Sequence, residues 1–255
     1  LPTYRPPAGE VLGDSKVRVD TGVVEGSEIT LFYDPMIAKM VTHAPTRLGA
    51  IDAMGEALDR TIIEGIRHNI PFLSALMAHP RWRSGELSTN FIDEEFPEGF
   101  AGGELDATAR RVLCAAAVSA ELARAERYRR LPDQMRRVPA PLNTEWTVDI
   151  AGEQLPVRVT EGTPGLPISL GLVIGDDAEP VTVTSDWRPG DLLWTGMVGN
   201  LSVSVQLQSA LNGYQATWHG VSTEVRVLRP RIAELDALMP EKIAADTSKF
   251  LLCPM

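Results

Sequence analysis

The sequence predicts an α+β protein in which a mixed N-terminal part precedes an eight-stranded antiparallel β-barrel around one long helix. Three observations support this fold class. Residues 1–100 alternate between strand-like and helix-like runs. Residues 105–129 contain neither Gly nor Pro and are rich in Ala, which favours a long helix. From Thr144 to Leu228 the hydrophobic pattern has a period of two, as in strands.

Length and composition exclude several classes of function. A chain of 255 residues can bury one large or two ordinary cores, and its net charge of −10 disfavours binding to nucleic acid or to an anionic membrane. No apolar run approaches the roughly 18 residues of a membrane span. Cys114 and Cys253 have no CxxC partner, and the N-terminus shows no signal pattern. We therefore expect reduced thiols, no zinc site and a cytoplasmic protein, or one of the mitochondrial matrix if the source is eukaryotic.

The N-terminal part is expected to contain several short elements. Thr46 is a candidate N-cap for a helix from about Arg47 to Thr61, with Ile62 still at helical spacing. A joint is expected at residues 101–103, Ala-Gly-Gly. The other predicted elements are strands at Val17–Val23, Glu28–Tyr33 and Ile37–Thr42, a helix at Pro71–Met77 and a helix after the cap Ser88–Asn90.

One face of the long helix carries mostly alanine, and such small side chains allow other backbones to approach closely. The positions on this face are Leu105, Ala109, Val112, Ala116, Ala120 and Ala123. This pattern favours a helix that is surrounded, although a surface helix with a stripe of small residues fits the spacing equally well.

Eight strand-like runs follow the helix, and closing them into a barrel would remove exposed sheet edges. Asn212-Gly213, between two alternating runs, is the most specific hairpin signal in the chain. The predicted strands are Glu145–Ile150, Leu155–Thr160, Ile168–Ile174, Val181–Asp186, Leu192–Val198, Leu201–Leu207, Tyr214–His219 and Val221–Leu228, with a short helix from Ile232 to Leu238 after them.

Few residues suggest catalysis. The four histidines, His43, His68, His79 and His219, have no metal-ligand spacing and are interpreted as surface or satisfied core residues. The pair Glu94-Glu95 is interpreted as solvated surface.

Two features rise above this background. The run from Phe32 to Lys39 predicts a turn at Asp34-Pro35 that presents Tyr33, Asp34 and Lys39. Arginines also cluster, at Arg124, Arg127, Arg129, Arg130, Arg136 and Arg137. The cluster indicates either a partner-binding surface or a solvated helix end with favourable cations.

The stretch from Tyr33 to Phe96 resembles the C-terminal domain of biotin carboxylases. The motifs are Tyr33–Lys39, Gly65–Asn69, His79-Pro80 and Ser88–Phe91, and the match covers about Leu1–Phe100. This family uses ATP and bicarbonate to carboxylate biotin. The resemblance places Tyr33 and Asp34 near the carboxylation site and Phe91 at an apolar adenine contact. The family's phosphate loop, ATP lysines and metal-binding glutamates precede Leu1 in its pattern, so no complete catalytic set and no metal ligands are expected here.

The remainder resembles the coupling (BT) domain of biotin-dependent acyl-CoA carboxylases of the propionyl type. The resemblance divides the chain into residues 1–100, a BT domain at 104–238 with helix 105–129, hook 131–143 and strands 145–228, and a linker at 239–255 toward a biotin carrier domain. It implies that the hook grips the carboxyltransferase β subunit. The expected contact residues are Leu131, Pro132, Arg136, Arg137, Pro139 and Pro141. Prolines would stiffen this loop and reduce the entropy lost on docking.

The resemblance implies a parent enzyme that uses biotin, ATP and Mg or Mn, with its own biotin carboxylase core, its carrier domain and the β subunit as partners. The chain alone is expected to be inactive and to bind no cofactor, and it contains no Met-Lys-Met tripeptide for biotin. Exchanging Arg136 and Arg137 for Glu should weaken β-subunit binding more than changes at Asp176-Asp177.

Two alternatives remain open at this stage. One is the α subunit of a methylcrotonyl-CoA carboxylase, which shares the first module and differs mainly in the coupling domain. The other is a non-catalytic β-barrel that binds a ligand or scaffolds a complex, since eight strands can enclose a cavity. An exposed, amphipathic helix at 105–129 would favour the second.

Overall fold

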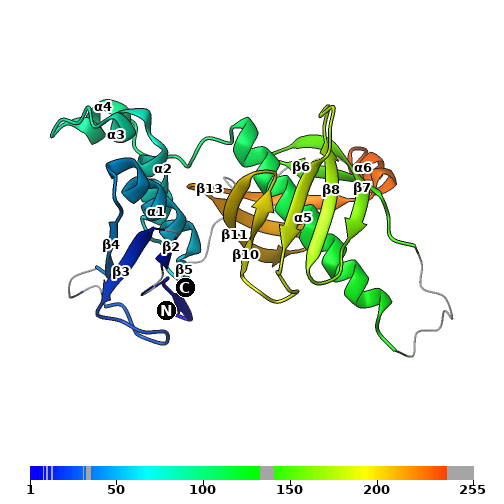
Figure 1. The fold of residues 1–255 in the computed structure, drawn as a ribbon, viewed down its shortest axis with the longest axis horizontal. Coiled ribbons are helices and arrows are strands. Elements are labelled where there is room, and N and C mark those ends of the chain that lie inside the picture. The colour runs from blue at the N-terminus through cyan, green and yellow to red at the C-terminus, as the bar shows by residue number, and fades with distance from the viewer. Residues whose placement is uncertain are drawn as a thin grey trace, which may run out of the picture.

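The computed structural model describes residues 1–7, 9, 11–12, 14–30, 32, 36–132 and 141–239 of the chain. It shows two parts side by side, an N-terminal part from β1 to α4 and a barrel part from α5 to α6 (Figure 1). The N-terminal elements are β1 (Thr3–Arg5), β2 (Val11–Leu12), β3 (Ser15–Thr21), β4 (Ala38–His43), α1 (Arg47–Arg60), β5 (Ile62–Glu64), α2 (Ile70–Ala78), α3 (Pro80–Ser84) and α4 (Phe91–Glu95).

The helix α1 confirms the predicted cap. Thr46 has an extended backbone, and its hydroxyl accepts a hydrogen bond from the N–H of Gly49 at 3.1 Å. The helix ends at Arg60, one residue before the expected end at Thr61, because Thr61 is extended. Ile62, which keeps the helical spacing, begins strand β5. Strand β5 pairs with β1 in a two-stranded sheet.

The predicted strand at Glu28–Tyr33 is wrong for its described residues. Residues 28–30 and 32 lie outside any strand, and Phe32 is 98% exposed. The reason is that β3 pairs directly with β4, for example Val17 with Thr42. Residues between these strands therefore connect a hairpin, and the alternating run has no ladder of hydrogen bonds to join.

The barrel part consists of α5 (Ala107–Arg129), eight strands and the short helix α6 (Pro230–Asp236). The strands form a closed antiparallel barrel in the order β10-β11-β12-β13-β6-β7-β8-β9, as predicted for the fold class. Their bounds are β6 (Glu145–Ile150), β7 (Glu153–Thr163), β8 (Ile168–Ile174), β9 (Val181–Ser185), β10 (Leu193–Val198), β11 (Leu201–Ala210), β12 (Gly213–Trp218) and β13 (Val221–Leu228).

Helix α5 runs through this barrel (Figure 1). Asp106 caps its start by accepting a hydrogen bond from the N–H of Ala109 at 2.7 Å. Every residue from Val112 to Ala120 is buried, so strands cover the helix on all sides and the surface-helix alternative is wrong. Small side chains let the helix fit inside eight strands, and a larger residue there would overpack the core.

Two hairpin turns of the barrel have nearly the same backbone. Ala151-Gly152 has φ values of 53° and 82°, and His219-Gly220 has 49° and 80°. Two consecutive left-handed residues match the twist of the flanking strands.

The Asn212-Gly213 hairpin forms, but its turn is Leu211-Asn212. Gly213 belongs to β12 and pairs with both Ala210 and Arg226. A Cβ at Gly213 would lie 2.0 Å from the carbonyl oxygen of Val225, so glycine is required by strand contact and not by turn geometry.

Helix α6 begins at Pro230, two residues before the expected start, because proline is well tolerated in a first turn. Arg226 on β13 holds it in place, with Nη1 2.9 Å from the Asp236 carboxylate and Nη2 2.6 Å from that of Asp149. Within the described ranges, no helix is long and apolar enough to cross a membrane.

Candidate functional site

The predicted site residues fall in two places. Phe91 begins α4 in the N-terminal part, whereas Leu131, Pro132 and Pro141 flank the connector at the far end of the barrel part (Figure 1). The structure does not bring these two groups together. The remaining predicted positions lie outside the described residues: Tyr33, Asp34, Arg136, Arg137 and Pro139.

Phe91 is enclosed by its neighbours. Its ring meets His79 edge-on at 5.1 Å between centroids, lies 6.2 Å from Trp82, and has the Arg81 guanidinium 5.3 Å above it. Only 5% of the residue is exposed. Phe91 therefore contributes to the packing of α3 against α4, and its predicted contact with adenine remains a prediction.

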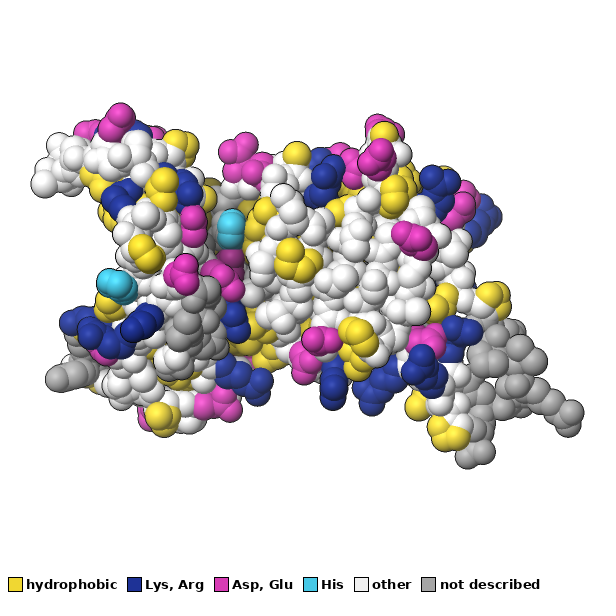
Figure 2. All heavy atoms as spheres, viewed as in Figure 1, with side chains coloured by type: hydrophobic (Ala, Val, Ile, Leu, Met, Phe, Trp, Pro, Cys, Tyr) yellow, Lys and Arg dark blue, Asp and Glu magenta, His cyan; other side chains and the backbone are white. Residues whose placement is uncertain are grey.

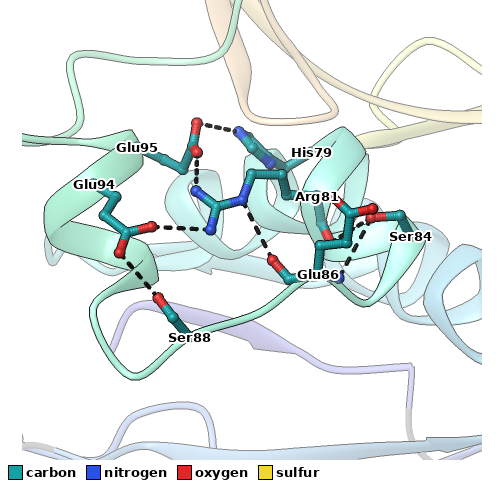
Figure 3. A network of polar contacts seen from close by, with 7 residues as sticks. All are labelled: His79, Arg81, Ser84, Glu86, Ser88, Glu94 and Glu95. Atoms are coloured by element: carbon teal, nitrogen blue, oxygen red, sulfur yellow. Dashed lines mark hydrogen bonds and ion pairs between the residues drawn. The ribbon is translucent and has the colours of Figure 1, made fainter.

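A polar network fixes this corner (Figure 3). The Arg81 guanidinium donates to Glu95 and, at 2.9 Å, to Glu94, while Nε2 of His79 lies 3.2 Å from the Glu95 carboxylate. The hydrogen bond from Arg81 lowers the pKa of Glu95. Ser88 donates to Glu94 at 3.2 Å. Glu94 is exposed and Glu95 partly exposed, in keeping with their interpretation as solvated surface, but both carboxylates also bind Arg81 across the α3–α4 bend, which was not predicted.

No metal ligands are grouped in the described part of the chain, where no three His, Cys, Asp or Glu residues are placed to hold an ion. Cys114 on α5 is fully buried, and burial raises the pKa of its thiol to about 12. A buried thiol that stays protonated is a structural residue and not a nucleophile.

The far end of the barrel carries the arginine cluster. Arg124 binds Glu121 at 2.8 Å, and Arg129 and Arg130 bind Glu126 at 2.6 and 2.8 Å. These pairs lie three or four residues apart on the last turns of α5, where cations also favour the helix C-terminus.

Three residues at the two ends of the predicted hook lie within the described part of the chain. Leu131, Pro132 and Pro141 are exposed. A cleft of about 160 Å³ begins at Leu142, next to Pro141, and lies between α5, residues 142–144 and β7, lined mostly by apolar groups that include Leu122 and Pro164.

Hydrogen bonds join the N-terminal part to the barrel part at a junction that the sequence did not predict. We define it by Asp59, Gln206, Gln208, His219 and Gly220. The Asp59 carboxylate, at the end of α1, accepts the His219 backbone N–H at 2.9 Å and lies 3.2 Å from its Nε2. Burial raises the pKa of Asp59 well above its ordinary value and lowers the pKa of His219. Both shifts oppose an ionised pair and favour a protonated Asp59 beside a neutral imidazole.

Two glutamines of β11 complete the junction. The amide of Gln206 donates to the carbonyl oxygens of Asp59 and Thr61 at 2.9 and 3.0 Å, and Gln208 donates to the Glu64 carboxylate at 2.8 Å. Gln206 thus satisfies carbonyl groups at the C-terminal end of α1 that the helix leaves open.

Comparisons with known proteins cover both parts. The family profile of the propionyl-coenzyme A carboxylase BT domain matches residues 113–242, and that of the biotin carboxylase C-terminal domain matches residues 1–94. The propionyl-CoA carboxylase alpha chain of Ruegeria pomeroyi is 45% identical over all of this chain and 39% of its own length. The mitochondrial alpha chain of Mus musculus is 34% identical over 94% of this chain and 33% of its own.

A shorter similarity covers less than a third of this chain. The biotin carboxylase of Halalkalibacterium halodurans is 43% identical over 30% of this chain and 17% of its own length. The chain therefore spans well under half the length of each of these relatives.

Proposed function

The chain belongs to the propionyl-coenzyme A carboxylase BT-domain family, and from this premise we propose that it is part of the α subunit of a biotin-dependent acyl-CoA carboxylase. The parent carboxylates biotin with ATP and bicarbonate, and propionyl-CoA is the proposed acceptor of the carboxyl group. The barrel part docks the parent on its carboxyltransferase β subunit. The N-terminal part belongs to the biotin carboxylase module.

One observation carries the proposal, namely a closed barrel whose lumen is occupied by α5. Residues Leu113 to Val118 are each 0% exposed. A barrel filled by its own helix has no room for a ligand, which disfavours the ligand-binding alternative. We therefore place the function of this part on the outer surface of the barrel, where a coupling domain would contact its partners.

Cofactor chemistry belongs to the proposed parent. Biotin and ATP are its proposed cofactors, together with Mg or Mn. Among the described residues only Phe91 is a candidate for contact with the nucleotide, and its ring is enclosed by His79 and Trp82. Nothing in the described part fits a metal, so the proposal assigns no catalytic step to these residues.

The test uses the full-length parent α chain and its β subunit. The α chain should cleave ATP in a reaction that depends on bicarbonate and biotin, and acyl-CoA carboxylation should require both subunits. Arg136→Glu with Arg137→Glu should weaken binding of the two subunits at least about tenfold, because interfacial arginines commonly dominate affinity.

The control is Asp176→Lys, an exposed charge reversal at the opposite end of the barrel, which should leave binding unchanged. Equal losses of affinity for the β subunit in both variants would contradict the assignment of the hook as the contact. Failure of the unaltered subunits to associate would remove the proposed function itself.

A further inference from the structure

Five neighbouring strands of the barrel, β8 to β12, contain no charged residue, whereas β13, β6 and β7 each contain at least two. Apolar side chains of β9, β10 and β11 point into the barrel, so the alternate residues form its outer face. Most of these outer side chains are hydroxyls or amides, namely Thr182, Thr184, Thr195, Ser202, Ser204, Gln206 and Gln208. Figure 2 shows a mostly white surface over β10 and β11, where side chains are neither charged nor hydrophobic. A neutral polar face costs less free energy to desolvate than a charged one, which suits it to binding.

One edge of this face belongs to the junction, and a groove opens beside it. Gln206 and Gln208 of β11 bind the N-terminal part. Next to them, the end of α1 lies opposite β9, β10 and β11 across a groove of about 430 Å³. This volume falls within the range of small-molecule sites, roughly 300–1,000 Å³. The groove therefore lies between the two parts of the molecule and has one wall from each.

The barrel wall of the groove carries five hydroxyl groups, from Thr184, Ser185, Thr195, Ser202 and Ser204. The Ser185 hydroxyl donates to the carbonyl oxygen of Thr195 at 2.7 Å. Among the hydrogen bonds of the described residues, none involves the hydroxyls of the other four. Ser204 is only 4% exposed, so its hydroxyl is nearly enclosed without a partner in the described part of the protein. Such a group needs a hydrogen bond from outside the fold, since an unsatisfied buried hydroxyl is destabilising.

Charges on the two walls decide which class of ligand the groove fits. Glu56 and Arg60 pair on the α1 wall, with 3.4 Å between Oε1 and Nη1, and Asp186 lies on the barrel wall. An anion would be repelled by two carboxylates, and a cation would meet the guanidinium of Arg60. An apolar ligand would remove water from the hydroxyls without replacing their hydrogen bonds. A polyol fits both walls, because carboxylates accept hydrogen bonds, a guanidinium donates them and hydroxyls do both.

We propose that this groove binds a small neutral polyol of about the size of a monosaccharide. We define the polyol groove by Glu56, Arg60, Thr195, Ser202 and Ser204. Adjacent hydroxyls of the ligand bond to the Glu56–Arg60 pair on one side and to the strand hydroxyls on the other. Because the ligand contacts both parts, its binding stabilises the junction between them in proportion to its occupancy. The inference does not rest on the proposed function.

The experiment measures binding of myo-inositol to the full-length α chain by saturation-transfer NMR. The probe is kept dilute, because concentrated polyols stabilise folded proteins in general through their exclusion from the surface. The unaltered chain should transfer saturation to the probe. An excess of inorganic phosphate should not displace it, since the groove selects a neutral ligand.

Two variants locate the binding. Thr195→Val with Ser204→Ala should weaken the affinity for myo-inositol at least about tenfold, because two hydrogen bonds to the ligand are lost. The matched control is Thr182→Val, which removes an exposed hydroxyl from the same face outside the groove and should bind as the unaltered chain does. Circular dichroism should show that both variants keep the fold, since none of these three hydroxyls has a partner among the described residues.

Amide hydrogen exchange gives a second readout. Myo-inositol should slow exchange at the end of α1, because the ligand holds the two walls together, and the Thr195/Ser204 variant at the same probe concentration corrects for general effects of the polyol. Absence of saturation transfer would overturn the inference, and so would unchanged affinity of the Thr195/Ser204 variant, which would place the polyol elsewhere. Binding without slower exchange in α1 would also overturn it, by showing that the ligand does not bridge the parts. Displacement by phosphate would contradict the neutral class of the ligand.

Discussion

At the scale of single residues, Asp59 has the most unusual environment of the described carboxylates. It is 5% exposed, accepts the backbone N–H of His219 and lies against the imidazole of the same residue. A carboxylate buried in this way is costly to ionise, yet its oxygen is needed as an acceptor. Asp59 therefore links the stability of the junction to pH.

We expect Asp59→Asn to remove this dependence on pH. Burial raises the folded-state pKa of Asp59, whereas the unfolded value is about 3.9. The stability that the proton supplies is complete below the unfolded pKa and is lost as pH rises through the folded one. The amide of the variant cannot ionise and keeps an acceptor for His219. The melting temperature of the unaltered chain relative to the variant should therefore fall as pH is raised from 5 to 8.

The control for this measurement is Asp20→Asn, on β3. Asp20 is an exposed partner of Arg18 at 3.2 Å, so its replacement removes only a surface pair. Its melting temperature relative to the unaltered chain should stay nearly constant over the same range. A constant difference for Asp59→Asn as well would show that the buried carboxyl titrates like an unfolded one.

At the scale of the element, two hairpin turns have the same backbone geometry but different surroundings. Comparing them distinguishes the cost of backbone strain from the cost of contact between the two parts. Gly152 and Gly220 have φ values of 82° and 80° in equivalent two-residue turns. A Cβ on Gly152 would meet nothing within 4 Å, whereas one on Gly220 would lie 2.5 Å from the carbonyl oxygen of Pro71. Only the second turn is pressed against α2.

We expect Gly152→Ala to cost about 1–2 kcal/mol of unfolding free energy, the penalty of a left-handed residue with a Cβ. Gly220→Ala should cost distinctly more, because the backbone of α2 must also move away from the turn. Urea denaturation of both variants measures the difference. Equal losses of unfolding free energy in the two variants would mean that the contact between the Gly220 turn and α2 opens at little cost.

Much of the barrel could be predicted because its signals are local. Alternation of period two follows from strands with one face on the core, and Glu145–Ile150, Ile168–Ile174 and Val221–Leu228 were bounded as the structure has them. The long helix was expected from composition, and its observed start at Ala107 is set by the Asp106 cap. Asn212-Gly213 marked the hairpin but not the turn, since local chemistry does not reveal a neighbouring strand.

The polar contacts could not be predicted because they join residues distant in sequence. Asp59 meets His219, 160 positions away, and Arg81 meets Glu95 across a helix bend. Neither pair has a characteristic spacing. The run at Glu28–Tyr33 has the alternating pattern of a strand. Its described residues form none, because β3 pairs directly with β4. The expected roles of Tyr33, Asp34 and the hook remain predictions that rest on resemblance.

At the scale of the whole molecule, the junction sets how the two parts face each other. The contacts come from a helix end, a strand and a hairpin turn, which together restrain rotation better than a single contact could. In the proposed parent, the biotin carboxylase module would then be held at a defined angle to the docking end of the barrel. Rigid orientation shortens the search between two active sites by limiting the accessible geometries.

The two glutamines of β11 offer the cleanest test of that restraint. Gln206→Ala and Gln208→Ala together remove three hydrogen bonds across the junction without touching the barrel interior. Each bond contributes about 0.5–1.5 kcal/mol, and the freed carbonyls of α1 can be hydrated once the parts open. Amide hydrogen exchange in β5 and at the end of α1 should therefore become faster, while exchange in α5 inside the barrel stays slow.

The matched control is Gln215→Ala on the neighbouring strand β12, whose amide donates to Ser222 within the barrel part at 3.0 Å. It should leave exchange in β5 unchanged. Faster exchange in α5 for the double variant would instead mean that the glutamines stabilise the barrel itself. In that case the junction would be a by-product of barrel folding, and the orientation of the two parts would depend on the Asp59–His219 contact and the Gly220 turn.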